Sequence, residues 1–411
     1  MYLPAPPAFS ADPPPGTTPR VAPAPPKPQD DIDPATGFAR STMVRPFVDP
    51  SAPVAPPPAA APSASPPGAT PNAPTGATAN APTGATPRPH IALILPIASP
   101  QLGRPADAVR QGFATAAEAE GRGAVPVVSM AVENDGPAII EACTRAQAAG
   151  ALLVVTGLTR DGATGIARSD CRRIPVLTLN QPAEGAGDDN PKLFSISLSV
   201  EQEGKQAALL AVSEGWHSAI MIGSNSALSK RVQEAFEKEW SRAAGEIAGR
   251  VTFAGGPDDA PLVKDRLAQM ARGDMVFLAL DPPEARLVRP YVSGMLPVYA
   301  TSLSIDPRAE ATVNVDLQGM RYMDMPWFVQ PDHPAVMVYP QPKNPMPVDY
   351  ERLYALGIDA YRISSVLLQG DRAKLSLDGV TGRITVEGNN LARALIPAEV
   401  DGGRVIPLKQ R

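Results

Sequence analysis

The sequence predicts an α/β protein in which two doubly wound lobes, each built on a mainly parallel sheet, follow a disordered N-terminal segment. Three observations lead to this prediction. Proline is concentrated before residue 90, an alternation of apolar strands and amphipathic helices begins at His90, and the alternation starts again near Glu201. Two consecutive series of this kind indicate two lobes rather than one large core.

The N-terminal segment differs from the rest of the chain in composition. Residues 1–89 contain 26 of the 50 prolines and few large apolar side chains, and the string NAPTGAT occurs at both 72–78 and 80–86. Such a segment cannot bury enough apolar surface to offset the entropy lost on ordering. We therefore expect 1–89 to be a disordered linker rich in Pro, Ala and Thr, and 90–411 to be folded.

The first series begins with a continuous apolar run at 91–97, which is typical of a strand buried on both faces of a parallel sheet. Further strands are expected at 125–132, 151–156, 175–179 and 193–198. Helices are expected between them at 105–120 and 137–149.

The second series repeats this alternation and then changes character. Its expected helices are 201–214, 228–244, 259–271 and 283–291, and its expected strands are 218–222, 251–254, 275–280 and 297–300. A long helix is expected at 350–368. Residues 376–386 are expected to form a hairpin that turns at Asp378-Gly379, or a strand pair broken by Gly382. The expected first lobe is about 90–199 plus 305–372, and the second about 200–304 plus 373–411.

Charge and hydropathy exclude several classes of protein. The net charge is −5 and no basic stripe is present, which argues against nucleic-acid binding. No apolar run approaches the ~18–20 residues that span a membrane. The opening string, MYLPAPPAFS, has neither the basic start and apolar run of a signal peptide nor a cysteine that could carry a lipid, so the sequence shows no export route.

Motifs for catalysis are weak throughout the chain. The three histidines, His90, His217 and His333, are far apart and lack the spacing of metal ligands, so we expect no metal site. No Walker loop or G-x-G-x-x-G string is present, so we expect no cofactor. No lysine has a serine three positions before it, which excludes an acyl-serine penicillin-binding enzyme.

Polar residues follow the expected strands at the edge where open α/β sheets bind ligands. They could hold a carboxylate or a peptide together with helix N-termini, or simply cap helices and close turns. The candidates are Ser99, Thr156, Asn180, Gln181, Ser224, Asp281, Thr301 and Ser302.

The two cysteines flank the third expected strand. Cys143 lies in the second helix and Cys171 lies just before the fourth strand, so a disulfide is geometrically feasible. An even count in an exported protein favours pairing. Two separate buried thiols are the equal alternative.

Seven strings in the folded part occur in an order that resembles one family. They are IALILPIASP (91–100), PVLTLNQP (175–182), MVFLALDPPEARLVRP (275–290), LPVYATS (296–302), MDMPWF (323–328), LYALGIDAY (353–361) and LDGVTGRITV (377–386). The first strings are shared with many two-lobed solute receptors, and the later ones are more specific. Over roughly 90–408 the chain resembles the penicillin-binding protein activator (LpoA/LppC) family of outer-membrane lipoproteins.

This resemblance implies a type I periplasmic-binding-protein-like fold and a non-enzymatic role. It implies a periplasmic, outer-membrane-associated regulator that binds a bifunctional class A penicillin-binding protein and stimulates peptidoglycan synthesis. The family would also lead us to expect a helical-repeat domain before the folded part, a lipid-bearing cysteine and a signal peptide, and we recognise none of these in the sequence given. The Pro-rich segment could instead serve as a tether.

A second function remains open beside the regulator. The fold and the polar strand ends also suit a periplasmic solute-binding protein for amino acids or related small molecules, with Ser99, Thr156 and Asp281 available to the ligand's charged groups. A cytoplasmic ligand sensor is a third alternative, suggested by the missing export signal. The specific strings favour the regulator.

Overall fold

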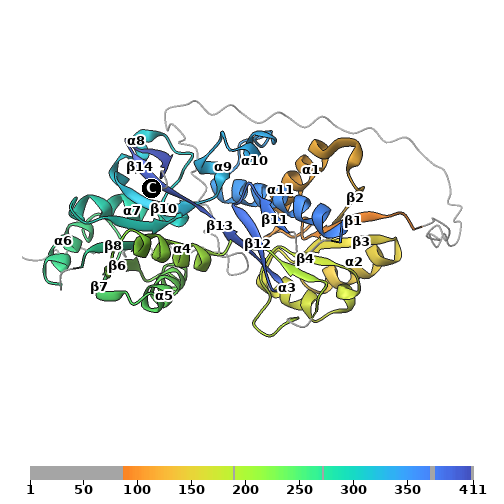
Figure 1. Cartoon of the computed structure of the whole chain (residues 1–411), viewed down its shortest axis with the longest axis horizontal. Helices are drawn as coiled ribbons and strands as arrows, with labels where there is room; N and C mark the ends of the chain where they lie inside the picture. The colour runs from red at the N-terminus through yellow and green to blue at the C-terminus, as the bar shows by residue number, and fades with distance from the viewer. Residues whose placement is uncertain (1–86, 188–189, 271–272, 371–374, 409–411) are drawn as a thin grey trace, which may run out of the picture.

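The computed structural model describes residues 87–187, 190–270, 273–370 and 375–408. They form two α/β lobes side by side along the long axis of the molecule (Figure 1). The expected disordered linker, 1–89, lies outside the described residues except for its last three. Within the described part, no helix is long and apolar enough to cross a membrane.

The first lobe is built on an eight-stranded sheet of order β11-β12-β13-β5-β4-β3-β1-β2. Its strands are β1 (His90–Leu95), β2 (Val127–Ala131), β3 (Ala151–Thr156), β4 (Val176–Thr178), β5 (Leu193–Ser195), β11 (Ser376–Asp378), β12 (Arg383–Glu387) and β13 (Asn390–Ala394). Its helices are α1 (Gly103–Glu120), α2 (Pro137–Ala148), α3 (Arg160–Ala167), α9 (Pro326–Val329), α10 (Pro334–Met337) and α11 (Val348–Leu368). The contacts among β1 to β5 and the contact of β13 with β5 are parallel, whereas β11 with β12 and β12 with β13 are antiparallel.

The second lobe is built on a seven-stranded sheet of order β15-β14-β10-β9-β8-β6-β7. Its strands are β6 (Ser218–Ser224), β7 (Glu246–Phe253), β8 (Met275–Ala279), β9 (Val298–Thr301), β10 (Met320–Asp324), β14 (Ile396–Asp401) and β15 (Arg404–Pro407). Its helices are α4 (Val200–Ser213), α5 (Ala227–Arg242), α6 (Ala260–Ala268), α7 (Pro282–Val288) and α8 (Ala311–Asn314). Short 3₁₀ turns follow some of these elements, among them η3 (Arg289–Tyr291) and η4 (Ser302–Ser304), and a similar turn, η2 (Asp170–Arg173), lies between α3 and β4 in the first lobe.

The expected division between the lobes is wrong in two places. Strand β10 belongs to the second sheet, although 305–372 was assigned to the first lobe. Strands β11 to β13 belong to the first sheet, although 373–411 was assigned to the second. The physical reason is that the chain crosses between the lobes three times: after β5, after β10 and after β13.

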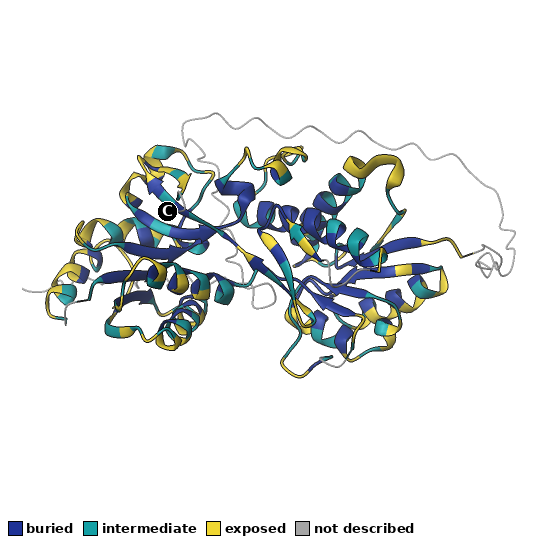
Figure 2. Ribbon diagram, viewed as in Figure 1, coloured by how far each residue is buried: buried dark blue, intermediate teal, exposed yellow. Residues whose placement is uncertain are grey.

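The central strands of each sheet form the core because most of their side chains are apolar on both faces. Every residue of β1 and of β8 is buried (Figure 2). Helices α1 and α11 pack closely across the first lobe because two glycines lie at their contact. A Cβ on Gly112 would lie 1.9 Å from the carbonyl oxygen of Tyr354, and one on Gly357 would lie 2.2 Å from that of Val109. Only glycine permits this approach.

Two expected elements differ in detail from the structure. The helix expected at 283–291 ends at Val288 and continues as the 3₁₀ turn η3, because Pro290 cannot donate a backbone hydrogen bond. The hairpin expected at 376–386 is present as β11 and β12, but the loop spans 379–382. Gly382 has a φ of 132°, a conformation that favours glycine.

Cys143 of α2 and Cys171 of η2 are joined by a disulfide, with their Cα atoms 5.7 Å apart. Both side chains are buried in the apolar cluster beneath the first sheet. Of the two alternatives left open by the sequence, the structure contains the bonded form. The bond ties α2 to the segment that leads into β4.

Candidate functional site

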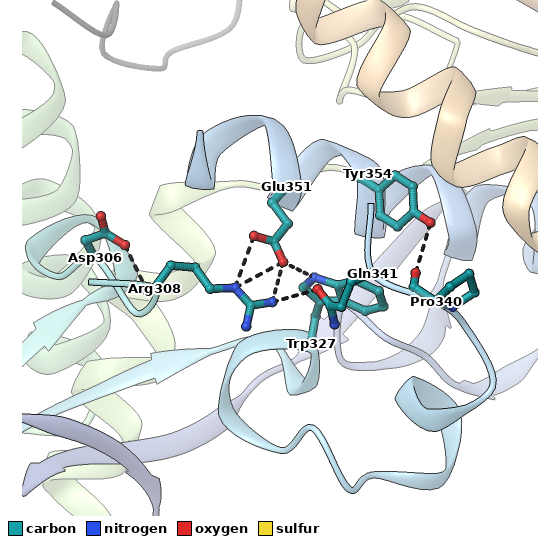
Figure 3. Close-up of polar contacts among 7 residues, drawn as sticks. All are labelled: Asp306, Arg308, Trp327, Pro340, Gln341, Glu351 and Tyr354. Atoms are coloured by element: carbon teal, nitrogen blue, oxygen red, sulfur yellow. Dashed lines mark hydrogen bonds and ion pairs between the residues drawn. The ribbon is translucent and has the colours of Figure 1, made fainter. Parts of the chain in front are cut away.

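Charged and aromatic side chains gather where the two lobes meet. This region is formed by the N-terminal turn of α11, the short helix α9, the segment after η4, and the ends of β10 and α4. Figure 3 shows the part of it around Arg308, Trp327 and Glu351. We call this region the junction. Its charged side chains pair across the two lobes rather than within one of them.

The first of these pairs, which we call the outer pair, joins Arg308 to Glu351. Arg308 lies between η4 and α8 in the second lobe, and Glu351 lies on α11 in the first (Figure 3). The Arg308 Nε atom donates to both carboxylate oxygens of Glu351 at 3.1 Å, and its Nη2 atom also contacts this carboxylate. Trp327 Nε1 donates to the same carboxylate at 2.7 Å, and Arg308 Nη2 donates to Gln341 Oε1 at 3.0 Å.

The second pair, the inner pair, joins Arg352 of α11 to Asp324 at the end of β10. Two parallel hydrogen bonds of 2.5 and 2.9 Å connect the guanidinium to the carboxylate. The side chains are 7% and 1% exposed. Burial is the largest single influence on Arg352 and opposes its charged form, but the charge and hydrogen bonds of Asp324, together with the nearby carboxylates of Glu203 and Asp349, outweigh it, so the pKa of Arg352 lies above its ordinary value.

An aromatic ring connects the two pairs. The guanidinium carbons of Arg308 and Arg352 lie 4.9 and 4.8 Å from the centre of the Phe328 ring. This distance is within the range of a cation–π interaction. Because Phe328 follows the second crossing of the chain, the outer and inner pairs are held around one of the segments that join the lobes.

A buried carboxyl group lies next to the inner pair. Glu203 of α4 is 6% exposed, and one of its carboxylate oxygens accepts a hydrogen bond of 3.0 Å from the backbone N–H of Ser302. Burial raises the pKa of Glu203, and the positive charge of Arg352 opposes this rise. The site therefore favours the protonated form of Glu203 more than water does.

The third crossing is fixed by a separate polar network. Asp359 of α11 accepts hydrogen bonds from the backbone of Val380 and from both the backbone and the hydroxyl of Thr381. Arg393 of β13 donates to the carbonyl oxygens of Ser197 and Thr381 at 2.8 and 2.9 Å. Burial raises the pKa of Asp359 and lowers that of Arg393. These bonds hold the β11–β12 loop against α11.

The candidates in the first lobe mainly stabilise local turns. Ser99 Oγ accepts from the N–H of Leu102 at 3.3 Å, which supports the start of α1. Asn180 donates to the Leu158 carbonyl at 3.1 Å and accepts from the N–H of Gln181 at 2.9 Å. Thr156 is fully buried, and its hydroxyl has no hydrogen-bond partner among the described residues.

In the second lobe too, some candidates stabilise local turns and one has a buried hydroxyl without a partner among the described residues. Asp281 caps α7, as its side chain accepts from the N–H of Glu284 at 2.8 Å. The Ser224 hydroxyl donates to the hydroxyl of Ser226 at 3.3 Å. Thr301 is buried, and in the described part of the chain its hydroxyl lacks a partner.

Of the residues proposed from the sequence, Ser302 contacts the junction through Glu203, and Thr301 pairs with Met323 at the end of β10. The charged residues of the junction were missed, although two of the quoted strings contain or adjoin them. Asp324 lies in MDMPWF, and Glu351 and Arg352 immediately precede LYALGIDAY. A charged residue inside an otherwise apolar string was the available signal.

The junction has the chemistry of a structural contact. Its charges neutralise one another across the lobes. Within the described ranges, no group of three His, Cys, Asp or Glu side chains is placed to hold a metal ion. A hollow of about 260 Å³ lies between α1 and the segment before α11, next to Arg104, Asn344 and Tyr350. It is smaller than the ~300–1,000 Å³ of most small-molecule sites.

Comparison with known proteins gives consistent results for family and fold. A family model described as "LppC putative lipoprotein" matches residues 83–400. Two similar proteins are named "Penicillin-binding protein activator LpoA". That of Photobacterium profundum is 24% identical over 334 residues, covering 72% of this chain and 53% of the relative. That of Vibrio antiquarius is 27% identical over 248 residues, covering 53% and 40%. The chain spans about half the length of the curated relatives it matches.

Solved structures share the two-lobed fold. A protein of Chromobacterium violaceum named as a "putative branched-chain amino acid ABC transporter" is 36% identical, with a TM-score of 0.66 over 76% of this chain and 100% of its own. The C-domain of LpoA from Haemophilus influenzae, named as a regulator of PBP1A, is 20% identical, with a TM-score of 0.62 over 78% and 100%. The predicted periplasmic-binding-protein-like fold is confirmed.

Proposed function

Because this chain belongs to the LppC lipoprotein family, we propose that it is a non-enzymatic regulator that binds and stimulates a class A penicillin-binding protein. The observation that supports this most directly is the name shared by its relatives, penicillin-binding protein activator. The proposed setting is the periplasm, with association to the outer membrane, because the family is described as lipoproteins. Peptidoglycan synthesis is the proposed process.

The junction supports this proposal physically. A protein that acts by contacting a partner needs a surface of fixed shape, typically about 800 Å² on each side. Two ion pairs around Phe328 join the lobes, so residues from both lobes can contribute to such a surface. No catalytic group is required for this function.

The test is an assay of glycan polymerisation and crosslinking by the cognate class A penicillin-binding protein, with increasing amounts of the full chain. Stimulation that saturates with added protein, and is absent with a penicillin-binding protein of another class, is the expected result. No stimulation, together with no complex in a pull-down, would overturn the proposal.

One observation favours a second candidate, a solute receptor for branched-chain amino acids. The neighbour that is 36% identical over its full length is named for such a transporter. Thr156 and Thr301 are buried and are the last residues of β3 and β9, which lie in opposite lobes. Ligands of such folds bind beyond the carboxyl ends of the strands. A receptor would show a thermal shift with leucine, isoleucine or valine that Thr156→Val or Thr301→Val abolishes. The exposed Thr144→Ala should retain the shift.

A further inference from the structure

We propose that the outer pair is a releasable contact that sets the angle between the lobes, while the inner pair is the fixed point about which they move. The two pairs come from consecutive residues of α11, Glu351 and Arg352, whose partners lie at different places in the second lobe. The pairs differ mainly in their access to water, and this difference determines which of them can open.

The side chains of the two pairs differ in how far they are exposed to solvent. The side chain of Arg308 is 41% exposed, whereas those of Arg352 and Asp324 are 7% and 1% exposed. When the outer pair opens, water can replace the partners of Arg308. Opening the inner pair would instead leave two charges without partners in a dry environment, which is strongly unfavourable. The outer pair therefore opens first.

Release would not leave Glu351 without a partner. Its side chain is 8% exposed, but Trp327 Nε1 donates to its carboxylate at 2.7 Å independently of Arg308 (Figure 3). Trp327 is tied to the first lobe, because its backbone N–H donates to the Val380 carbonyl at 3.0 Å and its ring centre lies 5.7 Å from that of Tyr354, so we expect it to stay beside α11 when the second lobe moves. The open state consequently retains a hydrogen bond at the most buried member of the outer pair.

Both ends of the outer pair are anchored to their own lobes. The backbone N–H of Arg308 donates to Asp306 Oδ1 at 2.9 Å, and Asn314 Nδ2 donates to the Asp306 carbonyl at 2.8 Å. On the other side, α11 is fixed to α1: the Tyr354 hydroxyl donates to the Pro340 carbonyl at 3.1 Å and can accept from the Thr115 hydroxyl, whose Oγ1 atom lies 2.9 Å away. A change in the Arg308–Glu351 contact is thus transmitted to whole lobes.

Distances between spin labels on the two lobes test the proposal in the full chain. Ala148 of α2 and Lys238 of α5 are exposed, and each is replaced by cysteine and labelled. The two native cysteines are bonded to each other and do not take label. The distance distribution is compared between this labelled parent and Arg308→Ala, which should shift or broaden it.

The matched control is Arg266→Ala. Arg266 pairs with Asp259 inside the second lobe, and their exposed fractions of 37% and 12% resemble those of the outer pair. This variant should leave the distribution unchanged. A distribution for Arg308→Ala that coincides with that of the parent would overturn the proposal, as would an equal change in Arg266→Ala.

Salt provides a second test that needs no substitution at the junction. Raising the ionic strength from 0.1 to 1 M shortens the screening length from about 10 to about 3 Å, which weakens the partly exposed outer pair more than the buried inner pair. The parent should then approach the distribution of Arg308→Ala, and a parent unaffected by salt would count against the proposal. Neither test includes a penicillin-binding protein, so the outcome is independent of the proposed regulatory function.

Discussion

Replacing Asp324 by asparagine tests the physical role of the inner pair. Asparagine has nearly the same shape, and its side-chain oxygen can still accept the hydrogen bond of 2.7 Å that the N–H of Met325 donates to Asp324 Oδ1. The substitution removes the negative charge and replaces the acceptor of Arg352 Nη2 by an NH2 group, so the guanidinium loses its counter-charge in a site where that side chain is 7% exposed. Breaking a buried ion pair from one side typically costs about 3–5 kcal/mol.

The lower part of that range is expected here. Arg352 keeps its contact with the Phe328 ring, 4.8 Å from the guanidinium carbon, which offsets part of the loss. Glu203 is close enough to influence the pKa of Arg352 and can ionise in response to the uncompensated positive charge. We therefore expect Asp324→Asn to lower the free energy of unfolding by about 3 kcal/mol.

A double-mutant cycle measured by urea unfolding checks this value. Arg352→Met removes the charge and keeps a long apolar side chain, so the double variant with Asp324→Asn should cost clearly less than the sum of the single variants. Asp170→Asn is the control, since its pair with Arg173 is 83% and 71% exposed, and its effect should stay within about 0.5 kcal/mol. A cost below about 1 kcal/mol for Asp324→Asn, or additive single effects, would refute the reasoning.

Three further predictions concern other parts of the fold. Titration of the unfolded, unreduced protein should find no free thiol, because Cys143 and Cys171 are bonded to each other. This bond links residues 28 positions apart, so its reduction should lower the free energy of unfolding, measured by chemical denaturation, by about 3–4 kcal/mol. Gly112→Ala should destabilise the protein by about 1–3 kcal/mol in thermal melts, because its Cβ would lie 1.9 Å from a carbonyl oxygen of α11. The control is Gly165→Ala in α3, which has open space around it and should be neutral or stabilising in the same melts. Burial raises the pKa of Glu203 above its ordinary 4.5, so above about pH 4.5 folding takes up a proton and the contribution of this group to stability is lost as the pH rises. The stability of Glu203→Gln relative to the unsubstituted protein should therefore increase as the pH rises from about 4.5. A difference in stability that does not change with pH would contradict the raised pKa.

The strands that the sequence predicts best are those whose burial is uniform. β1 and β8 are apolar at almost every position and are buried on both faces, so their pattern alone identifies them. β10 was missed because its sequence, MRYMD, contains two charged residues in five. Arg321 and Asp324 are accommodated by partners from distant parts of the chain, Glu214 and Arg352, and local patterns contain no information on such partners.

The candidate site was harder to predict than the fold for a related reason. A polar residue after a strand serves equally well to bind a ligand or to begin the next helix, and Asp281 caps α7 in the structure. The junction depends on where the chain crosses between the lobes. Assigning β11 to β13 to the wrong lobe concealed the crossing after β13, and with it the role of Arg393.

The two proposed functions make opposite demands on the same contact. A solute receptor must close around its ligand, so the free energy that separates its open and closed arrangements has to be small enough for ligand binding to overcome. A regulator that presents residues of both lobes to a partner gains affinity when that arrangement is fixed in advance. The inner pair, whose side chains are 7% and 1% exposed, suits a regulator with a fixed arrangement of the lobes. The outer pair, in which Arg308 is 41% exposed, still permits a limited opening of the lobes. If Arg308→Ala widens the range of lobe angles and also weakens stimulation of the synthase, the fixed arrangement is what the partner recognises. If it widens the range and stimulation is unchanged, the partner contacts one lobe alone.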